Sequence, residues 1–299
     1  FQVAMLFAIA MVASLLFSRL GLPKIVGQIT IGIIIGPSVL GLVSIAETGS
    51  VEEGTDIITL LATFGSTIML FVIGLECDFK EIYTKRNVAI AIGGISLPWV
   101  GGFLLAELLL PDSGLAAGKL AQSVFVGTAL VATSVAITAG VLREMGLLSS
   151  SIAKTILGVA VIDDVLGMIV LAISAGIASE GGLDVENLIW ISIAAVAFVT
   201  LGAYLGMKFF TKIIGEVERR GISYGLVESG FMLALAFAFL YAFVSEYIGI
   251  SKIVGAFIAG TSFSGCQYRK QFMQGIAFLE WAFAPIFFIS LGVLVDIRL

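Results

Sequence analysis

Residues 150–178, SSIAKTILGVAVIDDVLGMIVLAISAGIA, decide the fold of this chain. Their length and apolar composition predict a membrane-spanning helix, because a helix needs about 20 apolar residues to cross the hydrocarbon core of a bilayer. Two adjacent acids, Asp163 and Asp164, lie near the middle of the stretch. Each carboxylate costs on the order of 2.5–3.5 kcal/mol to insert at that depth. The pair therefore predicts a functional site, with salt bridges to neighbouring helices as the structural alternative.

The whole chain has the composition of an integral membrane protein. Of its 299 residues, 59% are hydrophobic and only 12% are charged, and the mean hydropathy is +1.13. Soluble domains carry about 25% charged residues. The chain has no histidine, which excludes a histidine pH switch and removes the usual zinc ligand and catalytic base. Cys77 and Cys266 predict no disulfide framework, and the net charge of −5 indicates no nucleic-acid partner.

Ten apolar spans predict an all-α fold that crosses the membrane many times. They cover residues 1–18, 24–42, 56–76, 88–110, 119–142, 150–178, 187–211, 226–247, 252–265 and 281–297. With the N-terminus outside, every basic residue except Lys119, Lys252 and Arg298 falls on one side of the membrane. The positive-inside rule makes that side cytoplasmic. We therefore expect a multi-pass protein of the cell membrane with an external N-terminus.

A short motif repeats in two spans that the charge rule orients in opposite directions. Lys24–Gly27 and Lys252–Gly255 both read KIVG, and Phe71–Asp78 is loosely echoed by Phe288–Asp296. An internal repeat of opposite orientation is typical of inverted-repeat transporters, whose substrate site lies near the midplane. Chance similarity of two glycine-rich helix starts is the alternative. Six spans in each half and one linker make thirteen expected spans, so the ten seen here predict a truncated sequence.

A hydroxyl-rich stretch in the middle of the fifth span includes Thr133 and Ser134. If the helix is unwound there, free carbonyls and helix ends would lie at an ion site. The alternative is a continuous helix in which these hydroxyls bond to carbonyls of their own helix. Asp163 and Asp164 lie about 100° apart around their helix. They therefore face different neighbours and do not share one proton, which argues against an intramembrane aspartyl protease. A carboxylate balanced between burial and a bound cation holds either a proton or a small cation.

Several motifs resemble the sodium/proton antiporters of the cation:proton antiporter-2 group, especially the NapA type. They are ATSVAIT at 132–138, VIDDVLG at 161–167, GPSVLG at 36–41, FVIGLE at 71–76, KIVGAFIAG at 252–260 and APIFFISLGVLVDI at 284–297. The resemblance implies that Asp164 binds the ion and that Asp163 pairs with a lysine late in the fold. It also implies three parts: a dimerisation panel of residues 1–76 and 226–297, half of an ion-transporting core at 88–178, and a linker helix at 187–211.

We therefore expect a secondary antiporter, not an enzyme, that exchanges Na⁺ or Li⁺ for H⁺ by alternating access. It would be an electrogenic homodimer in membrane lipid with no cofactor. Asp164 would bind Na⁺ or a proton in competition, Asp163 would be a second titrating site, and Thr133 and Ser134 would supply oxygens. A K⁺/H⁺ antiporter of the same fold and a Na⁺-coupled solute symporter are the alternatives. A channel is a third alternative, but the sequence shows no loop that resembles a selectivity filter.

The remaining polar residues of the spans favour structural roles. Gln28 is expected to form hydrogen bonds within the bundle, with a place in the lining of a cavity as the alternative. Glu76, Glu228 and Glu280 lie near cytoplasmic ends of spans, where solvated interfacial acids are expected. The alternative is that these acids attract cations to a funnel.

Overall fold

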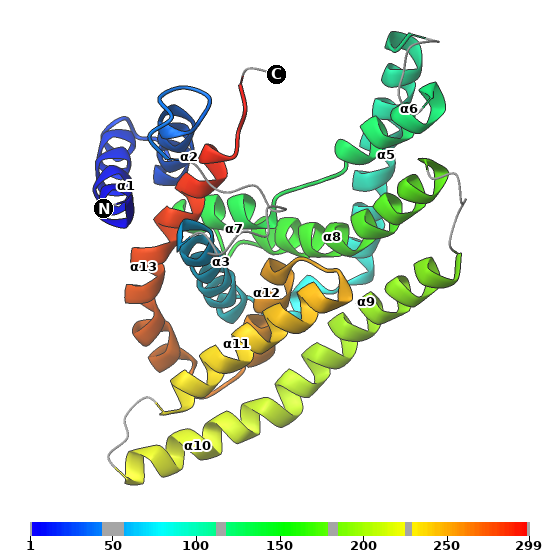
Figure 1. The fold of residues 1–299 in the computed structure, drawn as a ribbon. Helices are drawn as coiled ribbons and strands as arrows, with labels where there is room; N and C mark the ends of the chain where they lie inside the picture. Colours follow the sequence, from blue (N-terminus) through cyan, green and yellow to red (C-terminus); the bar gives the residue numbers. More distant parts are fainter. Residues whose placement is uncertain (1, 44–56, 112–117, 179–184, 225–228, 298–299) are drawn as a thin grey trace.

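The computed structural model describes residues 2–297 except 44–56, 112–117, 179–184 and 225–228, and in these residues every regular element is a helix (Figure 1). The helices are α1 (Gln2–Arg19), α2 (Lys24–Ile35), α3 (Ile57–Glu76), α4 (Phe79–Ile82), α5 (Lys85–Leu109), α6 (Lys119–Ala129), α7 (Val135–Glu144), α8 (Ser151–Ala178), α9 (Val185–Leu205), a π-helical segment η1 (Gly206–Phe210), α10 (Thr211–Ser223), α11 (Ser229–Ile248), α12 (Lys252–Phe263) and α13 (Arg269–Val293).

Each of the ten predicted spans contains a helix in its described part. Within the described residues, six continuous helices are long and apolar enough to cross a membrane: α3, α5, α8, the run from α9 into α10, α11 and α13. Three further spans are the shorter apolar helices α1, α2 and α12. The span predicted at 119–142 is divided into α6 and α7. The structure is thus that of an all-α, multi-pass membrane protein.

Three predicted span boundaries were wrong. The second span was expected to reach residue 42, but α2 ends at Ile35 because Gly36 is extended (φ −69°, ψ 176°), as the residue before a proline prefers. The tenth span was expected to begin at 281, but α13 begins at Arg269 because Phe272 and Ile276 are fully buried and extend its inner face. The seventh was expected to end at 211, but helical structure continues through α10.

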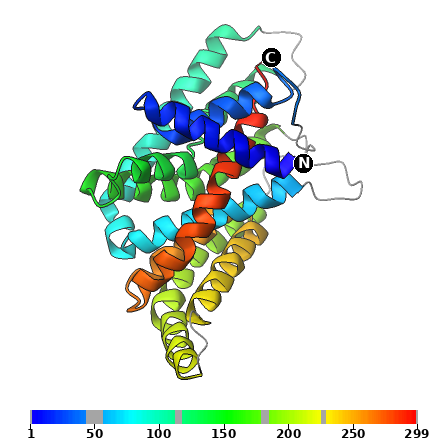
Figure 2. The ribbon, with the colours of Figure 1, turned by 90° about the vertical axis from the view of Figure 1, so that its left-hand side faces the viewer.

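Two close helix crossings form the centre of the structure. At one, α2 meets α13, and a Cβ on Gly32 would lie 2.9 Å from the Cα of Gly292. At the other, α3 meets α12, and a Cβ on Gly74 would lie 2.9 Å from the Cα of Gly260. Figure 2 shows α13 running across α3, which is a third extensive contact within the same group of helices. Only glycine allows backbones to approach this closely, which is how helices associate in lipid without a hydrophobic driving force.

These crossings follow the internal repeat. Lys24 and Lys252 are 228 positions apart, and the same shift carries Gly32 onto Gly260. It also carries Gly21 onto Gly249, and both have a positive φ, 71° and 95°, in the connection before a KIVG helix. Their N–H groups bond to equivalent carbonyls, those of Ser18 and Glu246. The two copies therefore share a backbone turn and a crossing glycine, which favours a structural repeat over chance similarity.

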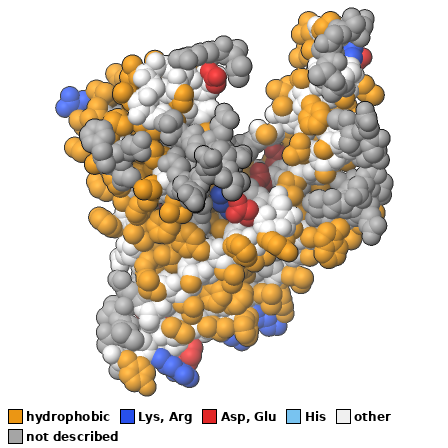
Figure 3. Space-filling model, in the orientation of Figure 1, with side chains coloured by type: hydrophobic (Ala, Val, Ile, Leu, Met, Phe, Trp, Pro, Cys, Tyr) orange, Lys and Arg blue, Asp and Glu red, His pale blue; other side chains and the backbone are white. Residues whose placement is uncertain are grey.

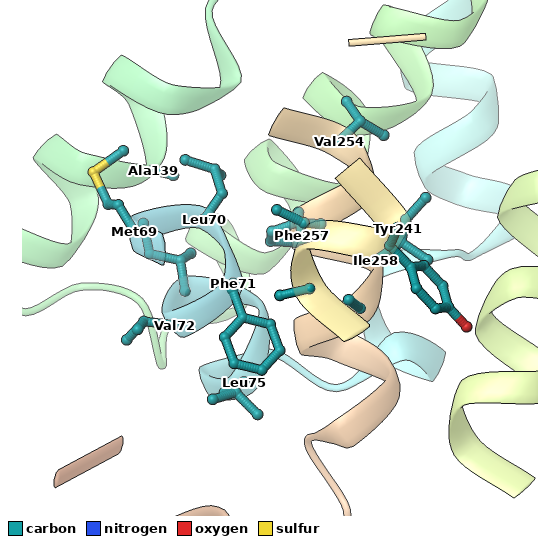
Figure 4. Packing of buried hydrophobic residues seen from close by; sticks show 14 of the residues in the cluster. Met69, Leu70, Phe71, Val72, Leu75, Ala139, Tyr241, Val254, Phe257 and Ile258 are labelled. Carbon is teal, nitrogen blue, oxygen red and sulfur yellow. The ribbon is translucent and has the colours of Figure 1, made fainter. Parts of the chain in front are cut away.

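The largest hydrophobic core lies where α3, α7, α11 and α12 meet. Figure 4 shows Phe71 and Leu75 of α3 close to α12, whose Phe257 and Ile258 are fully buried. Ala139 of α7 lies beside α3 in the same view. By contrast, α5 and α6 form an arm that packs on α8, at the upper right of Figure 1. The site described below lies between this arm, α7 and α8.

Gly260→Ala is expected to destabilise the protein by about 1–3 kcal/mol, because its Cβ would collide with the α3 backbone at Phe71 and Gly74. The matched control is Gly94→Ala on α5, where no atom lies within 4 Å of the added Cβ. The control should be neutral or slightly stabilising, because alanine has the higher helix propensity. The measurement is thermal unfolding in detergent. Equal midpoints for the two variants would show that the crossing does not need glycine.

Candidate functional site

The two adjacent acids lie near the middle of α8, as their position in the sequence predicts. Asp163 is buried, with 8% of its surface exposed, and Asp164 is partly buried. The helix packs against α5, α6, α7 and α9. Asp163 is therefore largely enclosed by protein, whereas Asp164 keeps part of its surface open.

The predicted interruption of the fifth span is present between α6 and α7. The last turn of α6 closes with the N–H of Val131 donating to the Thr128 carbonyl at 3.1 Å. The first turn of α7 is capped by Ser134, whose Oγ accepts from the N–H of Ile137 at 3.2 Å. The break thus brings together the carbonyl end of one helix and the N–H end of another, and these ends carry opposite partial charges.

A cavity of about 320 Å³ separates this break from the acids. Its polar lining comes from Thr128 and Thr133 on the α6 side and from Asp163 and Asp164 on α8. The hydroxyl of Thr133 donates to the carbonyl of Val131 at 3.3 Å, and Thr133 lines the cavity together with Asp163. Figure 3 shows a hollow between the left-hand body and the right-hand arm, with acidic side chains on its floor. The lining offers carboxylate and hydroxyl oxygens, which are hard ligands suited to small hard cations.

Three of the four predicted site residues meet in this cavity. Asp163, Asp164 and Thr133 line it, but Ser134 does not, and its hydroxyl is occupied as the cap of α7. Thr128 was not among the predicted site residues. The sequence contained one indication of it, because Thr128 belongs to the same hydroxyl-rich stretch as Thr133 and Ser134. Hydroxyls in a helix also commonly bond to carbonyls of their own helix, so this indication was not specific. The part each residue plays in binding stays a prediction.

Charged side chains at the other end of α7 bind it to the central helices. Arg143 forms ion pairs with Glu76 of α3, at 3.3 Å, and with Glu280 of α13. The neighbouring Glu144 accepts the backbone N–H of Lys24, at 2.7 Å, at the start of α2. One short helix therefore begins just after the break that lines the cavity and is held by α2, α3 and α13 at its last turn.

This network corrects the prediction that the span-end acids are solvated. The side chains of Glu76 and Glu280 are only 22% and 14% exposed, because both pair with Arg143. Glu228 lies outside the described residues. The prediction for Gln28 is confirmed, since it is buried and its amide donates to Ser14 Oγ at 2.9 Å.

The two thiols lie outside the membrane helices and are not ligands of the cavity. Burial raises the pKa of Cys77 to about 12, and the neighbouring carboxylate of Glu76 acts in the same direction. Burial also raises the pKa of Cys266. Both thiols therefore stay protonated near neutral pH. Among the described residues, no cluster of three or more His, Cys, Asp or Glu side chains could hold a metal ion.

Comparison with known proteins places this geometry in a family. Residues 6–299 match the family model described as "Sodium/hydrogen exchanger, transmembrane". The Na(+)/H(+)-K(+) antiporter GerN of Bacillus cereus is 34% identical over 295 residues, which are 98% of this chain and 70% of GerN. The probable Na(+)/H(+) antiporter GerT of the same organism is 32% identical over 92% of this chain and 68% of GerT. The high-affinity Na(+)/H(+) antiporter NhaS3 of Synechocystis is 28% identical over 93% of this chain and 64% of NhaS3.

Arg143→Gln is expected to lower the stability of the protein by about 1–3 kcal/mol, because it leaves two partly buried acids without their cation. Arg219→Gln is the matched control: it breaks an exposed pair with Glu216 on α10 and should change little. Thermal unfolding in detergent measures both. Adding Glu280→Gln to Arg143→Gln should recover part of the loss. The pairing would be refuted if the double variant were the less stable one.

Proposed function

Because this chain belongs to the sodium/hydrogen exchanger family, we propose that it exchanges Na⁺ or Li⁺ for H⁺ across a membrane by alternating access. Cation/proton antiport is the activity in the printed names of its relatives GerN, GerT and NhaS3. The protein is accordingly a transporter, and the cation and the proton are its substrates. The observation that carries the proposal is the pair of acids on α8, facing a cavity against an interrupted helix.

The role assigned to Asp164 follows from its surroundings. It lines the cavity from α8, and no salt bridge involving it is present in the described structure. A carboxylate in such a place is stabilised either by binding a proton or by binding a cation, so the two compete for it. Asp164 is therefore the proposed binding group for Na⁺.

The other three residues have distinct proposed roles. Asp163, which lines the cavity beside Asp164, is the second titrating site, so that more than one proton is exchanged per cation and transport moves charge. Thr133 supplies a hydroxyl oxygen beside the acids. Ser134 contributes through its backbone and its cap at the start of α7 rather than by lining the cavity.

A division into parts accompanies the proposed mechanism. Residues 1–76 and 226–297 are proposed to form the panel for homodimerisation, 88–178 half of the moving core, and 187–211 the linker. The close crossings among α2, α3, α12 and α13 support a rigid panel. The contacts of α5 with α6 and α8 support a separate core. We place the protein in the plasma membrane with its N-terminus outside, from the distribution of Lys and Arg.

K⁺/H⁺ exchange is the second candidate function. The printed name of GerN includes K⁺, and oxygen ligands alone do not distinguish the two ions. Proteoliposome exchange assays with Na⁺, Li⁺ and K⁺ in turn decide between the candidates. Cation-driven proton movement with K⁺ but not with Na⁺ would replace the first proposal by the second.

Asp164→Asn is expected to reduce Na⁺-driven proton flux in proteoliposomes to background, because the amide can neither titrate nor offer a negative charge. Asp78→Asn is the matched control, since Asp78 lies beyond the end of α3 and its carboxylate accepts from the local backbone N–H of Lys80. The control should transport like the wild type. Flux of Asp164→Asn near the wild-type level would refute the assignment.

The apparent affinity for Na⁺ is expected to rise with pH. Protonated Asp164 cannot bind Na⁺, so the apparent KM should fall by about tenfold per pH unit below the pKa of the site if one proton competes with one Na⁺. Above that pKa it should become constant. Initial rates at several Na⁺ concentrations and pH values measure the dependence. Since no histidine is present to sense pH, an apparent KM that ignores pH would rule out competition at this carboxylate.

A further inference from the structure

A cluster of three hydrogen-bonded side chains lies at the end of the cavity far from Asp163. Thr128 Oγ1 of α6 lies 2.6 Å from Ser174 Oγ of α8, and the indole N–H of Trp99 on α5 donates to Thr128 at 3.3 Å. Thr128 and Ser174 are 8% and 1% exposed. The cluster therefore joins α5, α6 and α8 through buried polar groups. The roles proposed above for Asp163, Asp164, Thr133 and Ser134 do not explain these groups.

The hydrogen bonds of the cluster differ from ordinary bonding of hydroxyls to their own helix. Thr128 also lies 2.9 Å from the Val124 carbonyl, and Ser174 lies 2.8 Å from the Val170 carbonyl. Each hydroxyl has a single proton. One proton must make the bond between Thr128 and Ser174, which leaves only one for the two carbonyls. The hydrogen bond between α6 and α8 is thus present although one of the two hydroxyls loses the bond to its own helix.

The cluster fixes one end of a segment that lies along the cavity. Thr128 pairs with Ser174, and Thr133 lines the cavity together with Asp163, so the segment from Thr128 to Thr133 runs antiparallel to α8. The Thr128 carbonyl accepts from the N–H of Val131, and the Val131 carbonyl accepts from the hydroxyl of Thr133. The carbonyls of Ala129 and Ala132, which also line the cavity, accept no hydrogen bond in the described structure, as is usual at or beyond the end of a helix.

The arm supports the cluster from behind through close backbone packing. A Cβ on Gly127 would lie 2.7 Å from the Trp99 carbonyl, and one on Gly102 would lie 3.0 Å from the Gly127 Cα. Trp99 is stacked on Phe103, with ring centroids 5.6 Å apart. The end of α6 is therefore held on one side by α5 and on the other by Ser174.

We propose that Thr128 and Ser174, supported by Trp99, are positioning residues that hold the carbonyl end of α6 at the distance from Asp163 and Asp164 that cation binding requires. They act through the α6 carbonyls and set both the affinity for Na⁺ and its discrimination from K⁺, because discrimination depends on the arrangement of the coordinating oxygens. This inference rests on the proposed function.

Thr128→Val tests the inference because it removes the hydroxyl with little change of volume. The apparent KM for Na⁺ in proteoliposomes should rise by roughly tenfold, and the maximal rate should change by less than about threefold. The ratio of the apparent affinities for K⁺ and Na⁺ should also change. Ser174→Ala should have the same effect, and the double variant should be no worse than either single variant, because the residues act as one unit. Thr128→Ser, which keeps the hydroxyl, should behave like the wild type.

Thr200→Val on α9 is the matched control. Its hydroxyl also bonds to its own helix, at 2.7 Å from the Val196 carbonyl, but it is exposed and away from the cavity. A merely structural role predicts that Thr128→Val lowers the unfolding temperature and leaves the KM and the K⁺/Na⁺ ratio unchanged. That result would overturn the inference.

A second measurement separates this inference from the proposed function. Bound Na⁺ should raise the unfolding temperature of the wild type in detergent by mass action, whether or not transport occurs. Thr128→Val should weaken this shift at a given Na⁺ concentration, and Thr200→Val should not. Suppose that the wild type shows no cation-driven flux, but Na⁺ still raises its unfolding temperature and Thr128→Val weakens that rise. This result would refute the proposed antiport and support the positioning role. Absence of both flux and shift in the wild type would refute both.

Discussion

The close approach of backbones at four glycines is the constraint on which the rest of the structure depends. Lipid tails are as apolar as leucine, so helices in a bilayer associate through van der Waals contact rather than through burial from water. Gly32 against Gly292, and Gly74 against Gly260, let α2, α3, α12 and α13 touch without intervening side chains. Large side chains such as Phe71 and Phe257 fill the space around the second crossing. The result is a dense group of helices to which one further element is bound.

That element is α7, and its two ends connect the central helices with the proposed ion site. Its first residue follows the break beside Asp163, and its last turn carries Arg143 and Glu144, which bind to α2, α3 and α13. Two acids on one turn of a membrane helix are unfavourable when both are charged and no cation is present. The site is therefore most stable when it holds a proton or a cation, and exchanging one for the other is the property that an antiporter requires.

Sequence reasoning was most successful where a single helix decides the outcome. The length of residues 150–178 and the mid-span position of the acids were sufficient to predict α8 and its place in the site. It was less successful at helix ends. It extended the second span past Gly36 because apolar residues follow, and it began the tenth span too late because Arg269 and Lys270 precede the apolar run. It also treated Glu76 and Glu280 as solvated, since both lie near the ends of predicted spans.

By itself, the sequence determined the class of the protein, the approximate number of its spans and the depth of Asp163 and Asp164, because length, hydropathy and position along a helix are local properties. Only the tertiary structure decided what these residues meet. It showed that the hydroxyl-rich stretch breaks its helix, that Thr128 bonds to Ser174 and that Arg143 lies between two acids. Residues 143 and 280 are 137 positions apart, and the spacing of a sequence says nothing about which faces of separate helices will pack together.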